Sequence, residues 1–428
     1  MTTSLSRAGH AAAIVAAGVL MGCSARSPAP EADASPPAPT VADARAFYAS
    51  QPEYLRPVAL GTAVPAGLPD AAAATCGGCH QAIYAEWQLS THARAWADDA
   101  QFQAELHKPR PDDGDVAWMC VNCHTPTEPQ LERLVVGLRD GRLDQPITID
   151  NPGFQATRQA EAIGCATCHV RDGVVVGPFG NTQAPHPVAK DESLLTVRVC
   201  TRCHQAKAEF PEIVLACAFN TGEEFAAADQ DAPNCQHCHM PTVDRPLVPG
   251  GPVRTTRRHW FGGSLIPKRP SDEADLAPLR DVFPDGLELA LVPLPSSVAA
   301  GQTVVVAARY KNAHAGHRLP TGDPERFITV QLTARGPDGA VLATTTARIG
   351  TVYRWHPDIE KLSDNRLAPG EERTVELTFV APAAGAVEIT ATAAKFRIAR
   401  EALEYHDLQD RYPAGRTFAT EAATVPVR

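Results

Sequence analysis

The alternation of apolar and polar residues changes near residue 280. Beyond that point, apolar runs rich in β-branched residues alternate in part with polar positions, and turn signals such as GPDG and APG separate them. This pattern is typical of strands. The predicted strands are GLELALV, TVVVAARYKN, RFITVQLTAR, AVLATTTARI, RTVELTFV and AVEITATAAKFRI, with TFATEAATVPV as a candidate seventh. They predict an antiparallel, immunoglobulin-like β-sandwich over residues 285–428.

Before residue 280, cleanly periodic segments are scarce. The clearest is QAIYAEWQLSTHARAW, in which Ile83, Trp87 and Ala95 or Trp96 fall at helical spacing. The 38 prolines and 30 glycines indicate much loop. We therefore expect a mostly α, loop-rich domain over residues 51–265, joined by a linker of residues 266–284 to the all-β domain.

The N-terminus predicts export. After Arg7, the apolar stretch HAAAIVAAGVLMGC ends at Cys23, and it is shorter than the roughly 20 apolar residues that span a bilayer. Residues 1–22 are therefore a predicted signal peptide. VLMGC resembles a bacterial lipobox, so we expect Cys23 to be lipidated; a plain signal peptide cut elsewhere is the alternative. Ser24 resembles the outer-membrane sorting pattern, which favours a periplasmic or cell-surface lipoprotein anchored to the outer membrane.

Residues 23–50 follow as a Pro/Ala-rich segment, SARSPAPEADASPPAPT and beyond, which is predicted to be a flexible tether. The whole chain of 428 residues is long enough for two or three domains. Its net charge of −10 and the absence of a basic run argue against a nucleic-acid partner.

Ten of the twelve cysteines fall in five Cys-x-x-Cys-His motifs. Zinc sites use Cys-x-x-Cys pairs without needing a histidine directly after them, and thioredoxin-like pairs occur in a βαβ setting that is not apparent here. Haem c attachment requires this spacing, because two thioethers fix the porphyrin and the adjoining histidine binds iron. We therefore predict five covalent haems. Their anchors are Cys76, Cys79, Cys120, Cys123, Cys165, Cys168, Cys200, Cys203, Cys235 and Cys238, and their proximal ligands are His80, His124, His169, His204 and His239.

The distal ligands should be histidines, because Met119 and Met240 lie beside attachment motifs and are badly placed to cross a haem. Nine histidines remain after His10 and the proximal five are removed. A helix through residue 92 would place His92 about 18 Å along its axis from His80, so a neighbouring haem is its expected target. The favoured candidates are His92, His186 in APHPV, His259 in HWFGG, His317 in AGHRLPTG and, less clearly, His107 in LHKPRP.

The remaining histidines are expected to form surface or core hydrogen bonds instead; they are His237, His314, His356 and His406. Cys217, in LACAFNTG, is expected to be a small buried hydrophobic residue.

Several segments resemble multihaem cytochromes of the cytochrome c-552/4 type. They are CGGCHQAIYAEWQLSTHARA, CQHCHMP, HWFGG and AGHRLPTGDPERFITVQL, and the resemblance covers roughly residues 70–335. It implies a mostly helical haem domain with closely stacked haems and bis-histidine ligation, in which His92, His186, His259 and His317 are distal ligands. Tetrahaem members have four motifs and this chain has five, so the inherited haem order and pairing stay open.

Motif density also indicates stacking, because the five motifs fall within residues 76–239. So little polypeptide cannot wrap each porphyrin separately, and the haems must form much of one another's packing surface. We favour an electron carrier with redox proteins as donor and acceptor. The alternatives are an oxidoreductase acting on a small nitrogen or sulfur compound at one five-coordinate haem, and a β-sandwich that docks a partner.

Overall fold

The computed structural model describes residues 37–180, 183–228, 232–355 and 358–428, and residues Pro39–Arg428 form one compact unit. The predicted signal peptide, Cys23, the first part of the predicted tether and His356 lie outside the described residues. In the described part of the chain, no helix combines the length and the apolarity needed to cross a membrane.

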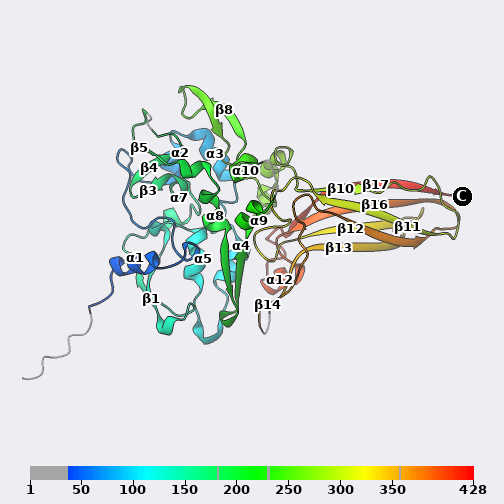
Figure 1. The fold of residues 1–428 in the computed structure, drawn as a ribbon, viewed down its shortest axis with the longest axis horizontal. Coiled ribbons are helices and arrows are strands. Elements are labelled where there is room, and N and C mark those ends of the chain that lie inside the picture. The colour runs from blue at the N-terminus through cyan, green and yellow to red at the C-terminus, as the bar shows by residue number, and fades with distance from the viewer. Residues whose placement is uncertain (1–36, 181–182, 229–231, 356–357) are drawn as a thin grey trace, which may run out of the picture. The chain divides into compact units, whose positions relative to one another are not determined.

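Short helices and small sheets alternate in the region that carries the motifs (Figure 1). The prediction of a mostly α domain is therefore wrong. The α-helices are α1 Val41–Ala49, α2 Ala73–Gly77, α3 Gln81–Leu89, α4 Ala100–Leu106, α5 Ala117–His124, α6 Ala156–Gln159, α7 Cys165–His169, α8 Arg198–His204, α9 Thr221–Ala226 and α10 Cys235–His239. The strands are β1 Arg133–Leu138, β2 Pro146–Asp150, β3 Val170–Arg171, β4 Val174–Gly177, β5 Val188–Lys190, β6 Ala206–Phe210, β7 Leu215–Phe219, β8 Thr242–Pro246 and β9 Val253–Arg257. Most of these strands are too short for a period of two to be seen in the sequence.

Helix α1 lies inside the predicted tether and corrects its C-terminal boundary. Thr40 and Asp43 form a capping box that satisfies the first backbone N–H groups of the helix. Ala44 and Tyr48 are buried in a hydrophobic cluster with residues of α5 and β1. The segment folds because these two positions, four residues apart, present one apolar face.

The predicted helix through His92 ends three residues before it. Helix α3 stops at Leu89, and its cap Ser90 is extended, with its Oγ donating to the Trp87 carbonyl at 2.6 Å. Residues 91–94 form a turn. The distance that we inferred from a continuous helix therefore does not apply, and His92 is placed by a turn.

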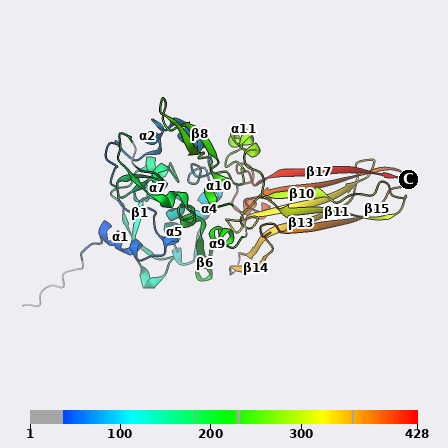
Figure 2. The same cartoon turned by 45° about the horizontal axis from the view of Figure 1, so that its top comes forward.

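The C-terminal part is a β domain made of two antiparallel sheets, whose strands Figure 2 shows side by side. One sheet has the order β10-β11-β15 and the other β14-β13-β12-β16-β17. All seven predicted strands are present, and β14 was missed because its residues are exposed throughout. The strands are β10 Leu287–Leu291, β11 Thr303–Asn312, β12 Phe327–Arg335, β13 Val341–Arg354, β14 Glu360–Asp364, β15 Glu372–Val380, β16 Gly385–Phe396 and β17 Gly415–Val427.

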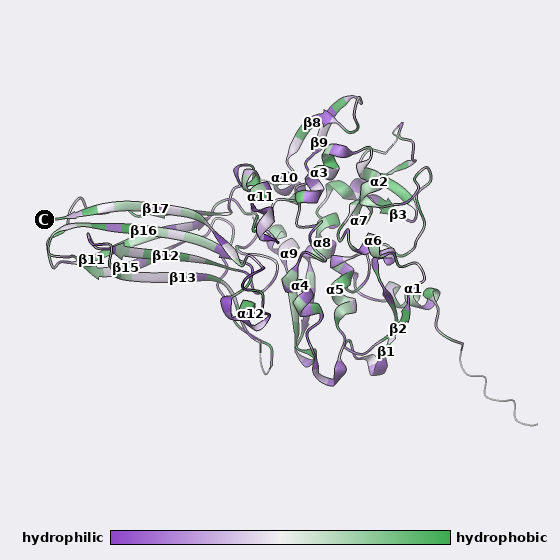
Figure 3. Ribbon diagram, turned by 180° about the vertical axis from the view of Figure 1, so that it is seen from behind, coloured by the Kyte–Doolittle hydropathy of each residue, from purple (hydrophilic) through white to green (hydrophobic). Residues whose placement is uncertain are grey.

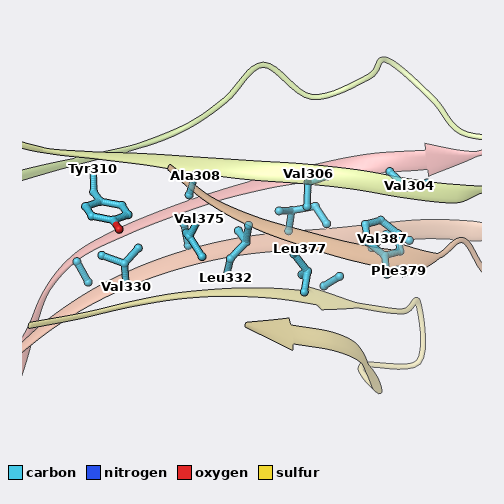
Figure 4. Close-up of a cluster of buried hydrophobic side chains, with 14 of the residues drawn as sticks. Val304, Val306, Ala308, Tyr310, Val330, Leu332, Val375, Leu377, Phe379 and Val387 are labelled. Carbon is cyan, nitrogen blue, oxygen red and sulfur yellow. The ribbon is translucent and has the colours of Figure 1, made fainter. Parts of the chain in front are cut away.

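Alternating side chains of both sheets fill one core, shown in close-up in Figure 4. Along β12, Ile328, Val330, Leu332 and Ala334 are buried, and Val306 and Leu377 meet them from the other sheet. Figure 3 shows the hydropathy of the same strands from behind. This alternation places apolar residues on one face of each strand, which is why the sequence predicted it.

The segment predicted as a linker contains short helices, among them α11 Glu273–Leu276. Leu265, Leu276, Leu279 and Phe283 form a small cluster there. A further helix, α12 Arg400–Tyr405, lies between β16 and β17, and Leu403 is buried in a second small cluster beside it.

We predict that Leu332→Ala lowers the free energy of unfolding by about 2–5 kcal/mol, because it leaves a cavity in a fully buried part of the core. Leu362→Ala on β14 is the matched control, since Leu362 is 54% exposed, and should change the free energy by no more than about 0.5 kcal/mol. Urea titration followed by circular dichroism measures both. Equal losses in the two variants would contradict the assigned core.

Candidate functional site

Each Cys-x-x-Cys-His motif lies in a short helix or at its end. Four motifs lie within α5, α7, α8 and α10, and the first begins in α2. There, the backbone N–H groups of Cys79 and His80 both donate to the Cys76 carbonyl, at 3.2 and 2.9 Å, so the helical turn continues. Residues three apart share a helix face. Each motif therefore presents two sulfurs on one side, next to its histidine.

Hydrophobic packing does not explain these helices. None of the residues of α2, α7, α8 and α10 belongs to the hydrophobic clusters of the described chain. Helix α8 has no buried residue, and in α10 only Gln236 is buried. A large apolar group bound between them would supply the missing burial.

Backbone carbonyls orient six of the predicted iron ligands through their Nδ1 atoms. His124 Nδ1 lies 2.7 Å from the Ala95 carbonyl oxygen, and His169 Nδ1 lies 3.0 Å from that of Val176. A neutral imidazole that donates from Nδ1 keeps its Nε2 lone pair for a metal. The other four pairs are His80 with Leu247, His239 with Gly262, His259 with Arg257, and His317 with Arg318.

Three proximal histidines of the motifs face a second histidine. The ring centres of His169 and His259 are 6.3 Å apart, and so are those of His239 and His317. Those of His92 and His204 are 6.4 Å apart. A metal–imidazole bond is about 2 Å long, so two imidazoles on opposite sides of one ion have ring centres about 6 Å apart. The residues present therefore fit an iron between each pair.

Burial favours the neutral form of His92, His204 and His259. Burial and the neighbouring histidines together lower the pKa of His92 to about 3. Burial also lowers the pKa of His204 and of His259 to about 4. A neutral imidazole has the lone pair that iron binds, whereas an imidazolium has none.

The other predicted ligands have different surroundings. His186 is half-buried, and its Nδ1 is a buried nitrogen without a hydrogen-bond partner. His107 is exposed at the C-terminal cap of α4. His237 is exposed on α10, whereas His314 lies 3.0 Å from Glu288 and His406 lies 2.8 Å from Glu105.

Thiols of different motifs are in contact. A hydrogen bond between Cys76 and Cys165 lowers the pKa of Cys76 and raises that of Cys165. Cys200 and Cys235 form the same kind of pair, and a hydrogen bond with Cys123 raises the pKa of Cys203. None of these cysteines forms a disulfide bond in the part of the chain that the structure describes.

Cys217 lies outside the motifs, on β7, opposite Ala208 of β6. Burial raises the pKa of its thiol well above the usual value. The thiol therefore stays protonated at neutral pH, so it is a poor nucleophile.

Glu86 on α3 is a residue that the sequence analysis missed. Its side chain is 6% exposed and accepts hydrogen bonds from Arg245 at 2.6 and 2.9 Å and from Arg258 at 2.6 Å. It also accepts from the backbone N–H of His259 at 2.9 Å. Burial opposes ionisation, but these donors outweigh it and hold the pKa of Glu86 below its usual range. This carboxylate therefore fixes the segment that carries His259.

Phe102 on α4 stacks on the imidazole of His124, with ring centres 3.6 Å apart and planes 4° from parallel. Asp99, the N-cap of the same helix, is buried and accepts hydrogen bonds from Lys268 and Tyr412. No sequence signal identified this polar group, because its members come from three separate segments.

Residues 75–139 match the family model described as cytochrome c554 and c-prime. The penta-heme cytochrome c552 from Thermochromatium tepidum has a similar structure, with 18% identity over 84% of this chain and 100% of that chain and a TM-score of 0.57. At this identity the likeness concerns the fold.

A CARDB domain from Pyrococcus furiosus aligns with 33% of this chain and 89% of its own at 14% identity, but its TM-score of 0.19 carries no argument. No curated protein sequence matches the chain. The family match and the first neighbour support a multihaem c-type cytochrome.

We predict that Glu86→Gln lowers the free energy of unfolding by about 3–5 kcal/mol, because it leaves two arginines beside a buried site without their counter-charge. Glu421→Gln on β17, where the side chain is exposed, is the control and should change it by less than about 0.5 kcal/mol. Urea titration of the purified proteins measures both. If the two variants unfolded at the same urea concentration, Glu86 would have no structural role.

Proposed function

We propose that the protein is a pentahaem c-type cytochrome that passes electrons along closely packed haems. The observation that carries this proposal is the set of three opposed histidine pairs, each with ring centres 6.3 or 6.4 Å apart. In every pair, one histidine belongs to a Cys-x-x-Cys-His motif and the other was predicted as a distal ligand. Haem c, when bound, supplies reversible one-electron chemistry at iron.

We assign each cysteine and histidine of the predicted sites a role in binding the five haems. The ten motif cysteines anchor the porphyrins, and the five motif histidines bind iron from the proximal side. We assign His259 as the distal partner of His169, His317 as that of His239, and His92 as that of His204. We assign His186 as the distal partner of His80. His186 precedes β5, and β5 pairs with β4. Strand β4 contacts α7, which in turn contacts α2, where the motif of His80 begins.

Contacts between thiols support an order for the haems. Porphyrins whose anchoring sulfurs touch have adjacent edges, so the Cys76–Cys165 contact joins the first haem to the third. The charge of Cys203 raises the pKa of Cys168, so these two thiols are near each other, and this supports a link between the third haem and the fourth. The contact between Cys200 and Cys235 joins the fourth haem to the fifth. The contact between Cys123 and Cys203 joins the fourth haem to the second. Electrons would therefore branch at the haem of His204.

The β domain contributes one distal ligand. His317 lies in the segment between β11 and β12, and its ring centre is 6.3 Å from that of His239. We propose that the immunoglobulin-like fold serves as a rigid holder for this segment. A role as a docking module for a membrane or extracellular partner is a further proposal for the same domain.

Export and anchoring complete the proposal. Haem c is attached outside the cytoplasm, which agrees with the predicted signal peptide and with a lipid on Cys23. The protein would then work in the periplasm or at the cell surface, tethered to the outer membrane, with other redox proteins as donor and acceptor.

One observation favours the second candidate, an oxidoreductase acting on a small nitrogen or sulfur compound such as hydroxylamine or nitrite. His107, the fifth predicted distal ligand, is exposed at the end of α4, and the ring stacked on His124 is that of Phe102. An open iron position at the haem of His124 would admit a small molecule.

We predict that the mature protein, purified from a host with haem c maturation machinery, carries five covalent haems. Intact-protein mass spectrometry would show the added mass of five haems, because two thioether bonds per haem survive denaturation. The variants Cys79→Ala and Cys238→Ala, which each remove one of the two thioether bonds of one haem, serve as controls. Fewer than five haems in fully matured wild type, or a mass corresponding to zinc, would contradict the motif assignment.

We predict that His259→Ala, His317→Ala and His92→Ala each convert one different low-spin haem to high spin, because each removes one distal imidazole. Electron paramagnetic resonance of the oxidised protein measures this. His314→Ala is the matched control and should leave the spectrum unchanged, since His314 pairs with Glu288. A wild type without a high-spin haem supports the carrier, whereas one high-spin haem and rapid reaction with nitrite or hydroxylamine support the oxidoreductase.

A further inference from the structure

A buried polar network connects α4 to the β domain beside His124. Gln101 Nε2 donates to Glu325 Oε2 at 2.7 Å. On its other side, Gln101 Oε1 lies 3.4 Å from the hydroxyl of Tyr412, which donates to Asp99 Oδ1 at 2.9 Å. Lys268 donates to Asp99 and, at 3.2 Å, to the Tyr412 hydroxyl. The network therefore runs from Glu325 to the Asp99–Lys268 ion pair.

The two ends of this network differ in charge compensation. Asp99 has Lys268 as its counter-ion, and although burial opposes its ionisation, Lys268 holds the pKa of Asp99 below its usual range. Glu325 receives only the neutral amide of Gln101 as a side-chain donor. A buried carboxylate without a counter-ion is costly, so such a group tends to take up a proton.

The surroundings of Glu325 reinforce this difference. Burial, together with the nearby charges of Asp323 and Glu105, raises the pKa of Glu325 to about 8, although Gln101 and Lys108 oppose this shift. Burial also raises the pKa of Asp323, although Arg326 and the backbone N–H of Glu325, which Asp323 Oδ1 accepts at 2.9 Å, oppose this shift. The charged and titratable groups around Asp323 and Glu325 are Asp99, Glu105, Lys108 and Arg326. His406 joins them through its contact with Glu105.

Two contacts connect Glu325 to the predicted proximal ligand His124. Gln101, the hydrogen-bond donor to Glu325, directly precedes Phe102, whose ring lies 3.6 Å from that of His124. A separation of about 10 Å between two charges at an effective dielectric of about 20 changes a proton affinity roughly tenfold. At such a separation, an electron on iron held by His124 would raise the proton affinity of this carboxylate.

We propose that Glu325 is a proton-loading site, which takes up one proton from water when one electron reaches the haem held by Cys120, Cys123 and His124. This inference rests on the proposed function. The electron comes from a one-electron donor through the neighbouring haems. Iron passes from the ferric to the ferrous state, the carboxylate becomes a carboxylic acid, and one O–H bond forms. On reoxidation the proton returns to solvent, and the Gln101–Tyr412–Asp99 network holds the side chain in place.

The pH window follows from the sign of the coupling. The added electron raises the proton affinity of Glu325. At a pH well below the pKa of Glu325 in the oxidised protein, the carboxyl is protonated in both redox states. At a pH well above its pKa in the reduced protein, it is ionised in both. Uptake is therefore greatest near and just above pH 8 and is lost by about pH 6.

Reduced-minus-oxidised infrared spectra of the full haem-loaded protein test this proposal. Near pH 8 the wild type should gain a carboxylic acid C=O band on reduction, and the gain should fade by about pH 6. Glu325→Gln should abolish it, while the exposed control Glu421→Gln should retain it. Asp323→Asn removes a charge that raises the pKa of Glu325, so it should move the gain to lower pH. A pH-indicator dye in weak buffer should show less proton uptake for Glu325→Gln than for the wild type and the control.

Two outcomes overturn the proposal. One is a wild type that reduces fully near pH 8 without gaining the band, and this measurement requires no variant to fold. The other is an unchanged band in Glu325→Gln. A protein that carries no reducible haem would instead refute the proposed function, so the two failures are distinguishable.

Discussion

The structure depends on keeping pairs of imidazoles a fixed distance apart. Rings 6.3 Å apart do not touch each other, so no direct contact sets their separation, and each ring must be held from behind. Backbone carbonyls do this for most of them: Val176 holds His169, and Arg257 holds His259. The two members of a pair come from segments far apart in the chain. The loops that carry them are therefore constrained as strictly as helices, although they lack repetitive hydrogen bonding.

This requirement explains how the two parts of the chain share the burial of apolar surface. The β domain has one large core to which both sheets contribute, and it can hold the segment of His317 rigidly. The haem region has smaller clusters, the largest around Tyr48 and Trp118, and four of its motif helices contribute to none of them. Bound porphyrins would supply the missing apolar surface there. The fold of this region is thus coupled to its ligands in the way that metal-binding domains are.

The β strands and the attachment motifs could be predicted from the sequence, because each is a local pattern. Strand β11 falls at the residues expected, since alternation over ten positions leaves little ambiguity. Helix α1 was missed because a capping box and two buried residues are a weak signal within a Pro/Ala-rich stretch. The end of α3 before His92 depends on one serine side chain. Glu86 could not be found, because its partners Arg245 and Arg258 are about 160 residues away and only the fold brings them together.

Two glutamates, the buried Glu86 and the half-buried Glu325, show how the surrounding hydrogen-bond donors determine the behaviour of a carboxylate. Glu86 receives two arginines and a backbone N–H, its pKa is lowered, and its negative charge is permanent at neutral pH. Glu325 receives one amide, its pKa is raised to about 8, and its charge is exchangeable. A permanent charge suits a structural role, because its field is the same in every redox state. An exchangeable charge can follow the redox state, because a single electron nearby shifts its protonation by about as much as a change of one pH unit. The same residue type can therefore hold a ligand segment in one place and accept a proton in the other, and the number of donors around each carboxylate determines which.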